Sequence, residues 1–329
     1  MSASFAGSIA VKYFIIGICG LAALVLVSLL VGAVTLSPHD LLSGQSEKAR
    51  LILFSSRVPR TISLVLAGAS MAIAGSIMQM LSRNRFVEPG TSGTIESAVF
   101  GLLLATLIAP GLPVFAKMLL SVTSALLGTV LFLAVLERAP LRSPLLVPLV
   151  GLMLGGVINA AATFIAYRFD VLQSLVGWST GDFSMVLRGR YELLWVSFVA
   201  AVAAYVIADR FTLAGLGQDI SSNLGVNYRR TMIVGLGIVA LVTASVVATV
   251  GAVPFVGLVV PNVVSIAIGD NVRRAVPWTA LLGAVFVLGC DIVGRTMIRP
   301  YEIPLGSIVG VLGSAIFLLL LKRAASRYG

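Results

Sequence analysis

Charged residues are scarce in this chain, and that scarcity excludes a water-soluble protein. Only 11% of the 329 residues are charged, whereas 58% are hydrophobic and the mean hydropathy is +1.06. A globule of this size with so few charges would lack the polar surface that keeps a protein in solution. The composition therefore predicts a polytopic membrane protein.

Residues that carry catalysis or hold metals are equally few. The single histidine, His39, has no cysteine or histidine nearby, which favours an interfacial loop residue over a metal ligand or proton relay. Cys19 and Cys290 both lie in apolar runs, so neither a disulfide framework nor a metal cluster is expected. Because no Walker phosphate loop, G-x-S-x-G elbow or H-E-x-x-H motif occurs, we expect no enzymatic activity, cofactor or metal.

The positive charge is distributed as in a membrane protein. The formal net charge of +10 and isoelectric point of about 10.2 would by themselves also suit nucleic-acid binding. The lysines and arginines, however, stand in short groups between apolar runs and form no continuous basic face. This pattern favours membrane topology as their explanation and no nucleic-acid partner.

Ten apolar windows predict an all-α protein with ten membrane-spanning helices in a single domain over residues 1–329. No connecting segment is long enough for a second domain, and the first window is longer than the core of a signal peptide. The windows cover residues 13–36, 61–81, 94–110, 114–136, 144–166, 192–208, 232–250, 252–268, 275–298 and 305–321.

An even number of helices places both termini on one side of the membrane. Thirteen basic residues then share that side and ten lie opposite, which favours cytoplasmic termini. The margin is small because Lys48, Arg50, Arg57 and Arg60 crowd the first external loop. External arginines in such number indicate a role other than topology.

Two segments are predicted to depart from simple spanning helices. Prolines and glycines between residues 249 and 261 predict a turn between the seventh and eighth helices, with its backbone buried in protein or facing a cavity. Residues 167–192 are too polar to cross the membrane and are expected to form a short helix and loop at the external interface.

Acidic residues stand at or near the ends of the windows. A carrier driven by protons or sodium ions normally keeps ionisable groups at mid-membrane, so ion coupling is disfavoured. The residues concerned are Glu96, Glu137, Glu192, Asp209 and Asp291.

Four motifs follow one another along the chain: RVPRTISLVLAGASMAIAGSIMQMLSRNRFVEPGTSG, LAGLGQDISSNLGVNYRR, GAVPFVGLVVPNVVSIAIGDNVRR and CDIVGRTMIRPYEIPLGSIVGVLGSAIFLLLL. Together they resemble the FecCD/BtuC-like permease subunits of binding-protein-dependent ABC importers for ferric siderophores, haem and cobalamin. Many members have P-H-x-x-R in the third motif, where this chain has Pro261, Asn262 and Ser265. That form resembles the ferric siderophore subgroup.

The resemblance implies an architecture and a set of partners. It implies the ten-helix fold of a type II ABC importer permease in the bacterial cytoplasmic (inner) membrane. The partners would be a cytoplasmic ABC ATPase dimer, a second permease subunit, identical or homologous, and an extracytoplasmic substrate-binding protein that delivers a ferric siderophore. Haem or cobalamin as substrate stays open within the family, and hydropathy alone also fits a secondary transporter or a structural membrane protein.

Three external arginines are expected to dock the binding protein. Arg57 and Arg60 flank Pro59, and Arg295 follows Asp291 by four residues. In the family, arginines at these places accept acidic residues from the two lobes of the binding protein, which suits the guanidinium fork. Interfacial snorkelling, or for Arg295 a structural pair with Asp291, is the alternative.

The internal loop from Asp209 to Arg230 is expected to couple the permease to the ATPase. Gly215 and Gly217 end the sixth helix, and the residues after them can form a short helix that Gly225 caps. An ordinary solvated connector is the alternative, although compact loops of about 20 residues usually have a function. The resemblance assigns the coupling contacts to Gly217, Ser221, Leu224, Gly225, Val226 and Arg229.

The translocation pathway is expected along the fifth helix. The matching helix of the family lines the channel at the dimer axis, which makes Gly155, Gly156 and Asn159 the candidate pathway residues. Plain helix packing is the alternative for a face of small residues. A weakly binding conduit is expected, because a tight site in the pore would slow release.

The predicted topology can be tested with single cysteines and a membrane-impermeant thiol reagent. Cysteines at Ser46 and Gln173 should react from outside intact cells, and cysteines at Gln218 and Ser326 only after permeabilisation. Labelling of Ser46 and Ser326 from the same side would rule out ten helices.

Overall fold

The described part of the computed structural model comprises residues 2–32, 47–138, 146–189, 191–269, 271–298 and 301–328. Within it the chain is all helical, with seven helices long and apolar enough to cross a membrane. One bent pair of helices and two shorter apolar helices complete the bundle. These ten units correspond to the ten predicted windows.

Most helices begin and end within a few residues of the predicted bounds, but α1 begins and ends earlier than predicted and α15 ends later. Arg50–Leu81 is continuously helical through α3, a π-helical turn at Leu53–Arg57 and α4, so the second helix starts well before the predicted residue 61. The other main helices are α1 (Ser2–Leu30), α5 (Thr94–Ile108), α6 (Val114–Arg138), α7 (Leu146–Arg168), α9 (Leu194–Val206), α10 (Ala208–Ala214), α12 (Tyr228–Val250), α13 (Val256–Ile268), α14 (Val272–Thr296) and α15 (Leu305–Tyr328).

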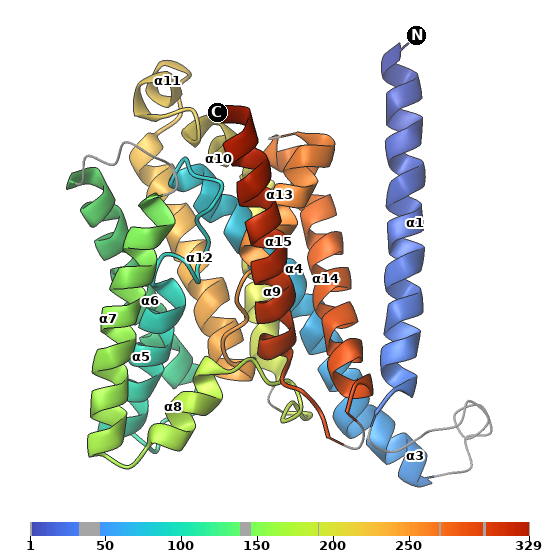
Figure 1. The fold of residues 1–329 in the computed structure, drawn as a ribbon, viewed down its shortest axis with the longest axis vertical. Coiled ribbons are helices and arrows are strands. Elements are labelled where there is room, and N and C mark those ends of the chain that lie inside the picture. Colours follow the sequence, from blue (N-terminus) through green and yellow to red (C-terminus); the bar gives the residue numbers. More distant parts are fainter. Residues whose placement is uncertain are drawn as a thin grey trace.

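Both chain ends lie at the same end of the bundle, the upper end in Figure 1, here called the termini end. The short helix α11 (Gln218–Asn223) lies there too, whereas α3 (Glu47–Ile52) and α8 (Leu172–Ser179) lie at the opposite end. The short helix expected between residues 167 and 192 is therefore confirmed as α8. His39, Ser46, Arg142 and Asp270 lie outside the described residues.

Helix α4 is buried on nearly all sides and organises the bundle. A Cβ on Gly68 would lie 2.5 Å from the carbonyl oxygen of Gly283 in α14, and one on Gly75 would overlap the carbonyl oxygen of Gly257 in α13. Backbones can approach this closely only where both helices carry glycine, the usual way in which membrane helices pack tightly. Gln79, the polar residue near the end of α4, donates from Nε2 to that same Gly257 oxygen at 3.2 Å.

Two helices begin inside the bundle. After α4 the chain turns back from the termini end, and α5 starts near the middle of α7, where Gly93 packs against Gly155. Helix α13 likewise follows an extended segment, residues 251–254, and starts at Phe255, whose φ is +63°. The predicted turn between the seventh and eighth helices is confirmed. At 15 and 13 residues, α5 and α13 are too short to cross the hydrocarbon core alone.

Candidate functional site

At the opposite end, two of the three predicted docking arginines meet on one carboxylate. Arg60 donates from Nη2 to Asp291 Oδ1 at 2.7 Å, and Arg295 Nη2 lies 2.7 Å from Asp291 Oδ2. A second carboxylate, Glu302, accepts from Arg60 Nη1 at 2.6 Å. Asp291 is 2% exposed and Arg295 is 4% exposed, so this cluster is part of the protein interior. The structural pair of Arg295 with Asp291, the alternative to docking, is present.

Two of the three predicted docking arginines also donate hydrogen bonds to the end of α1. Arg295 Nη1 donates to the backbone oxygens of Ser28 at 3.0 Å and Val31 at 2.7 Å. Arg57, separate from the Asp291 cluster, donates from Nη1 to the oxygens of Leu29 at 2.6 Å and Leu30 at 2.8 Å. Carbonyls in the last turn of a helix have no partner within the helix, so guanidinium groups stabilise that end.

The three arginines lie at the end opposite the chain termini, as the span count predicted, but most of their internal partners were missed. The three side chains were expected to face outwards, whereas Arg57 and Arg295 are buried and Arg60 is the least enclosed, with 12% of its side chain exposed. Glu302 and the carbonyls of α1 were missed because they are distant in sequence. The i,i+4 spacing of Asp291 and Arg295 was the one local signal.

At the termini end, the predicted coupling loop forms a compact helical hairpin. Gly217, with φ +104°, precedes α11, and Gly225, with φ +77°, follows it. Val226 N–H donates to Ser221 O at 2.9 Å and Gly225 N–H to Ser222 O at 3.0 Å, which is the Schellman pattern of a glycine cap. The predicted cap at Gly225 is confirmed. Ser221 is buried, and its hydroxyl donates to the backbone oxygens of Gly217 and Leu213.

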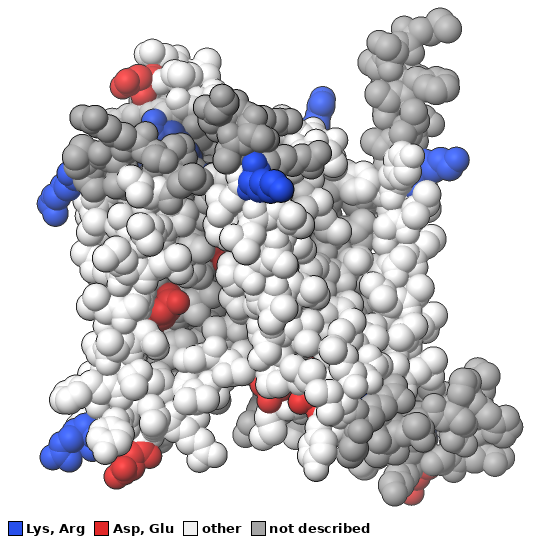
Figure 2. Space-filling view, in the orientation of Figure 1, with Lys and Arg blue, Asp and Glu red and all other residues white. Residues whose placement is uncertain are grey.

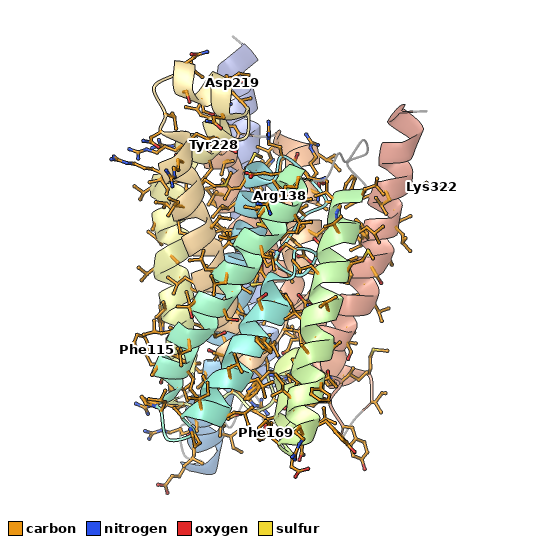
Figure 3. The ribbon with its side chains drawn as sticks, turned by 90° about the vertical axis from the view of Figure 1, so that its left-hand side faces the viewer. Phe115, Arg138, Phe169, Asp219, Tyr228 and Lys322 are labelled. Carbon is orange, nitrogen blue, oxygen red and sulfur yellow. The ribbon has the colours of Figure 1, made fainter. Side chains whose placement is uncertain are left out.

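Three large apolar side chains of this hairpin are exposed, beside the exposed polar side chains of α11. Leu216, Ile220 and Leu224 are 52%, 50% and 57% exposed, respectively. Arg229 is exposed as well, and Val226 is half-buried. Figure 3 shows Asp219 of α11 at the end that also holds Arg138 and Lys322, away from Phe115 and Phe169. Several large exposed apolar side chains on one short segment are typical of a protein-contact surface.

Midway along the bundle, the predicted pathway residues line one cavity. Gly155, Gly156 and Asn159 of α7 all border a space of about 330 Å³. Leu152 of α7 also lines it, and its remaining walls come from α5, α8 and the segment before α13, through Ile95, Glu96, Val99, Ser179 and Ala252. The structure thus brings the three predicted residues together on one surface.

Glu96 corrects one step of the sequence argument. It does stand in the first turn of α5, at the end of a helix, but that end lies beside Gly155, close to the middle of α7. A carboxylate therefore lies midway along the helical bundle and not at one of its ends. Figure 2 shows acidic atoms in a hollow halfway up a wall that is otherwise uncharged. The sequence prediction missed the position of Glu96, because hydropathy predicted that α5 crosses the membrane from side to side.

A second carboxylate, Glu88, has a structural role beside this cavity. It is 1% exposed, and its Oε1 accepts from the backbone N–H of Phe255 at 2.8 Å, at the start of α13. Asn262 in α13 donates from Nδ2 to Arg85 O at 2.8 Å. These two bonds join the returning segment after α4 to α13. Asn262, singled out from sequence as a subgroup marker, is thus a structural link here.

The described part of the chain is a helical bundle with a buried ion-pair cluster at one end, a hairpin with exposed leucine and isoleucine side chains at the other and a cavity between them, an arrangement that suits a membrane transport permease. The chain belongs to the FecCD transport family, whose profile matches residues 20–323. It is 50% identical over 300 residues to the petrobactin import system permease protein YclN of Bacillus subtilis (strain 168), covering 91% of this chain and 95% of that protein.

Two further comparisons agree with this assignment. The ferric-anguibactin transport system permease protein FatD of Vibrio anguillarum is 38% identical over 286 residues, covering 87% of this chain and 91% of that protein. A solved inward-facing structure described as a metal-chelate type ABC transporter superposes with a TM-score of 0.80 at 22% identity, covering 95% of this chain and 99% of that one. The structural match establishes the fold.

The Asp291 cluster can be separated from an ordinary surface ion pair by its effect on stability. Asp291→Asn leaves two buried arginines without their shared carboxylate and should destabilise the detergent-solubilised protein by about 3–5 kcal/mol. Asp209→Asn removes a carboxylate from an exposed pair with Arg273 and should leave the unfolding midpoint nearly unchanged. Equal midpoints for the two variants would contradict the assigned role of Asp291.

Proposed function

We propose that this chain is the permease subunit of an ABC importer that moves a ferric siderophore across the bacterial cytoplasmic membrane. The observation that carries the proposal is the 50% identity, along nearly the whole chain, to a permease named for petrobactin import. The anguibactin relative points to the same substrate class. Haem and cobalamin are the alternatives within the family, and a secondary transporter is disfavoured by membership of this family.

The proposed complex contains three further kinds of subunit. An ATPase dimer binds the termini end in the cytoplasm. A second permease subunit, identical or homologous, packs along the surface that Gly155, Gly156 and Asn159 form, here called the pathway surface. An external binding protein delivers the chelate. The exposed side chains of Ile220 on α11 and of Leu216 and Leu224 on either side of it support the ATPase contact, because a water-facing apolar surface is stabilised when a partner covers it.

Docking of the binding protein is proposed at the Arg60 cluster. Arg60 and Glu302 are the members with solvent-exposed side chains, at 12% and 24%. A carboxylate of the binding protein that replaces Glu302 on Arg60 would preserve the charge balance of the cluster. Arg57 and Arg295 would then contribute by holding α1 and Asp291 in place, and Arg60 would make the direct contact.

The import function is tested with proteoliposomes that contain this permease, its ATPase and its binding protein. Ferric siderophore uptake should require ATP, and the double variant Leu224→Asp/Val226→Asp should lose both ATPase copurification and uptake, because it puts carboxylates into an apolar contact. Leu224→Met keeps the surface apolar and is the matched control. Uptake without ATP, or undiminished ATPase binding by the double variant, would overturn this part of the proposal.

The docking proposal predicts an order of effects on stimulation of the ATPase by the binding protein. Arg60→Glu sets like charges against each other and should reduce stimulation most, whereas Arg60→Lys keeps the charge but loses the fork and should reduce it less. Arg57→Glu should act through the stability of the α1 end, so thermal unfolding of each variant is measured alongside. If folded Arg60→Glu is stimulated as strongly as the parent, docking occurs elsewhere.

A further inference from the structure

The cavity that Gly155, Gly156 and Asn159 border also has a carboxylate oxygen without a hydrogen-bond partner in its wall. Glu96 Oε2 is buried and accepts no hydrogen bond from any described residue. Glu88 Oε2 also lacks a partner among the described residues, but Glu88 does not border the cavity and its Oε1 accepts from the backbone N–H of Phe255. A buried carboxylate oxygen without a hydrogen-bond partner is costly, and such groups usually mark a site for a ligand or an ion.

The Glu96 side chain can lie where it does because a glycine faces it. A Cβ on Gly155 would lie 3.1 Å from the Glu96 carboxyl carbon, so the side chain lies directly against the α7 backbone. Gly156 next to it borders the cavity and has open space where a side chain would stand. The small residues of α7 therefore make room for the carboxylate and for something beside it, in addition to any role in helix packing.

The walls indicate which chemistry the space would accept. Among the described lining residues Glu96 is the one ionisable side chain, and Asn159 and Ser179 add an amide and a hydroxyl. A hard metal ion prefers six or more oxygen ligands, several of them carboxylates, and this wall offers one. A single carboxylate with neutral hydrogen-bonding neighbours suits an ammonium group, which needs one counter-charge and a few acceptors.

We propose that this cavity is a subsite for a protonated amine on the transported chelate, with Glu96 as its counter-charge and Asn159 and Ser179 as neutral partners. The proposal rests on the proposed import function and names a substrate feature: chelates with a cationic amine arm are favoured over the same chelates without one. One ion pair in an otherwise neutral wall binds weakly enough to allow release, as a conduit requires.

The test uses a matched pair of probes, a ferric trihydroxamate with one terminal primary amine and the same chelate N-acetylated. Equilibrium binding of each to the permease–ATPase complex in lipid nanodiscs is measured with radioactive iron. The parent should bind the amine form about tenfold more tightly, which corresponds to about 1.4 kcal/mol. Glu96→Gln should abolish this preference, and Glu137→Gln, at the exposed end of α6, should retain it.

A second variant keeps the proposal testable if Glu96→Gln does not fold. Asn159→Lys places an ammonium group of the chain itself in the same cavity and should also remove the preference. Equal binding of the two probes by the parent, or a preference that survives in folded Glu96→Gln or Asn159→Lys, would overturn the subsite. ATP-dependent uptake of any ferric chelate by the parent, measured in parallel, distinguishes that outcome from failure of the import function.

Discussion

The close approach of α4 to α13 and α14 is the constraint on which the rest of the structure depends. The hydrophobic effect does not favour association of helices in lipid, so van der Waals contact between their backbones stabilises the bundle. The glycine pairs Gly68–Gly283 and Gly75–Gly257 allow that contact. Helix α4 is enclosed along its length. Buried charge lies at one of its ends, and the chain turns inwards at the other.

Polar groups are buried at both ends of α4, and different partners stabilise them at each end. At one end, Arg60 and Arg295 share Asp291, so the positive charges that crowd this region are neutralised inside the protein. At the other, the segment after α4 returns into the bundle, and its polar groups bond to α13 through Glu88 and Asn262. Non-helical backbone at membrane depth is stable only with such internal partners. The half-length helices α5 and α13 follow from this arrangement.

The half-length helices in turn shape the surface that the proposed function needs. Because α5 starts beside the middle of α7, the cavity forms there and Glu96 reaches it. The hairpin around α11 lies at the termini end and the Asp291 cluster at the other, with α4 and α14 running between them.

The sequence by itself determined the membrane class, the positions of the helices, the cap at Gly225 and the short helix α8, because each depends on local hydropathy or on one backbone conformation. The RNRFVEPGTSG segment and the residues around Asn262 also indicated the family, since each of these motifs is a contiguous stretch of the chain. Only the tertiary structure decided that Arg57 and Arg295 turn inwards, that Glu302 joins the cluster and that Glu96 lies beside the middle of α7. Those outcomes depend on which distant segments meet, and hydropathy along a chain does not encode how deeply a helix end is set in the bundle.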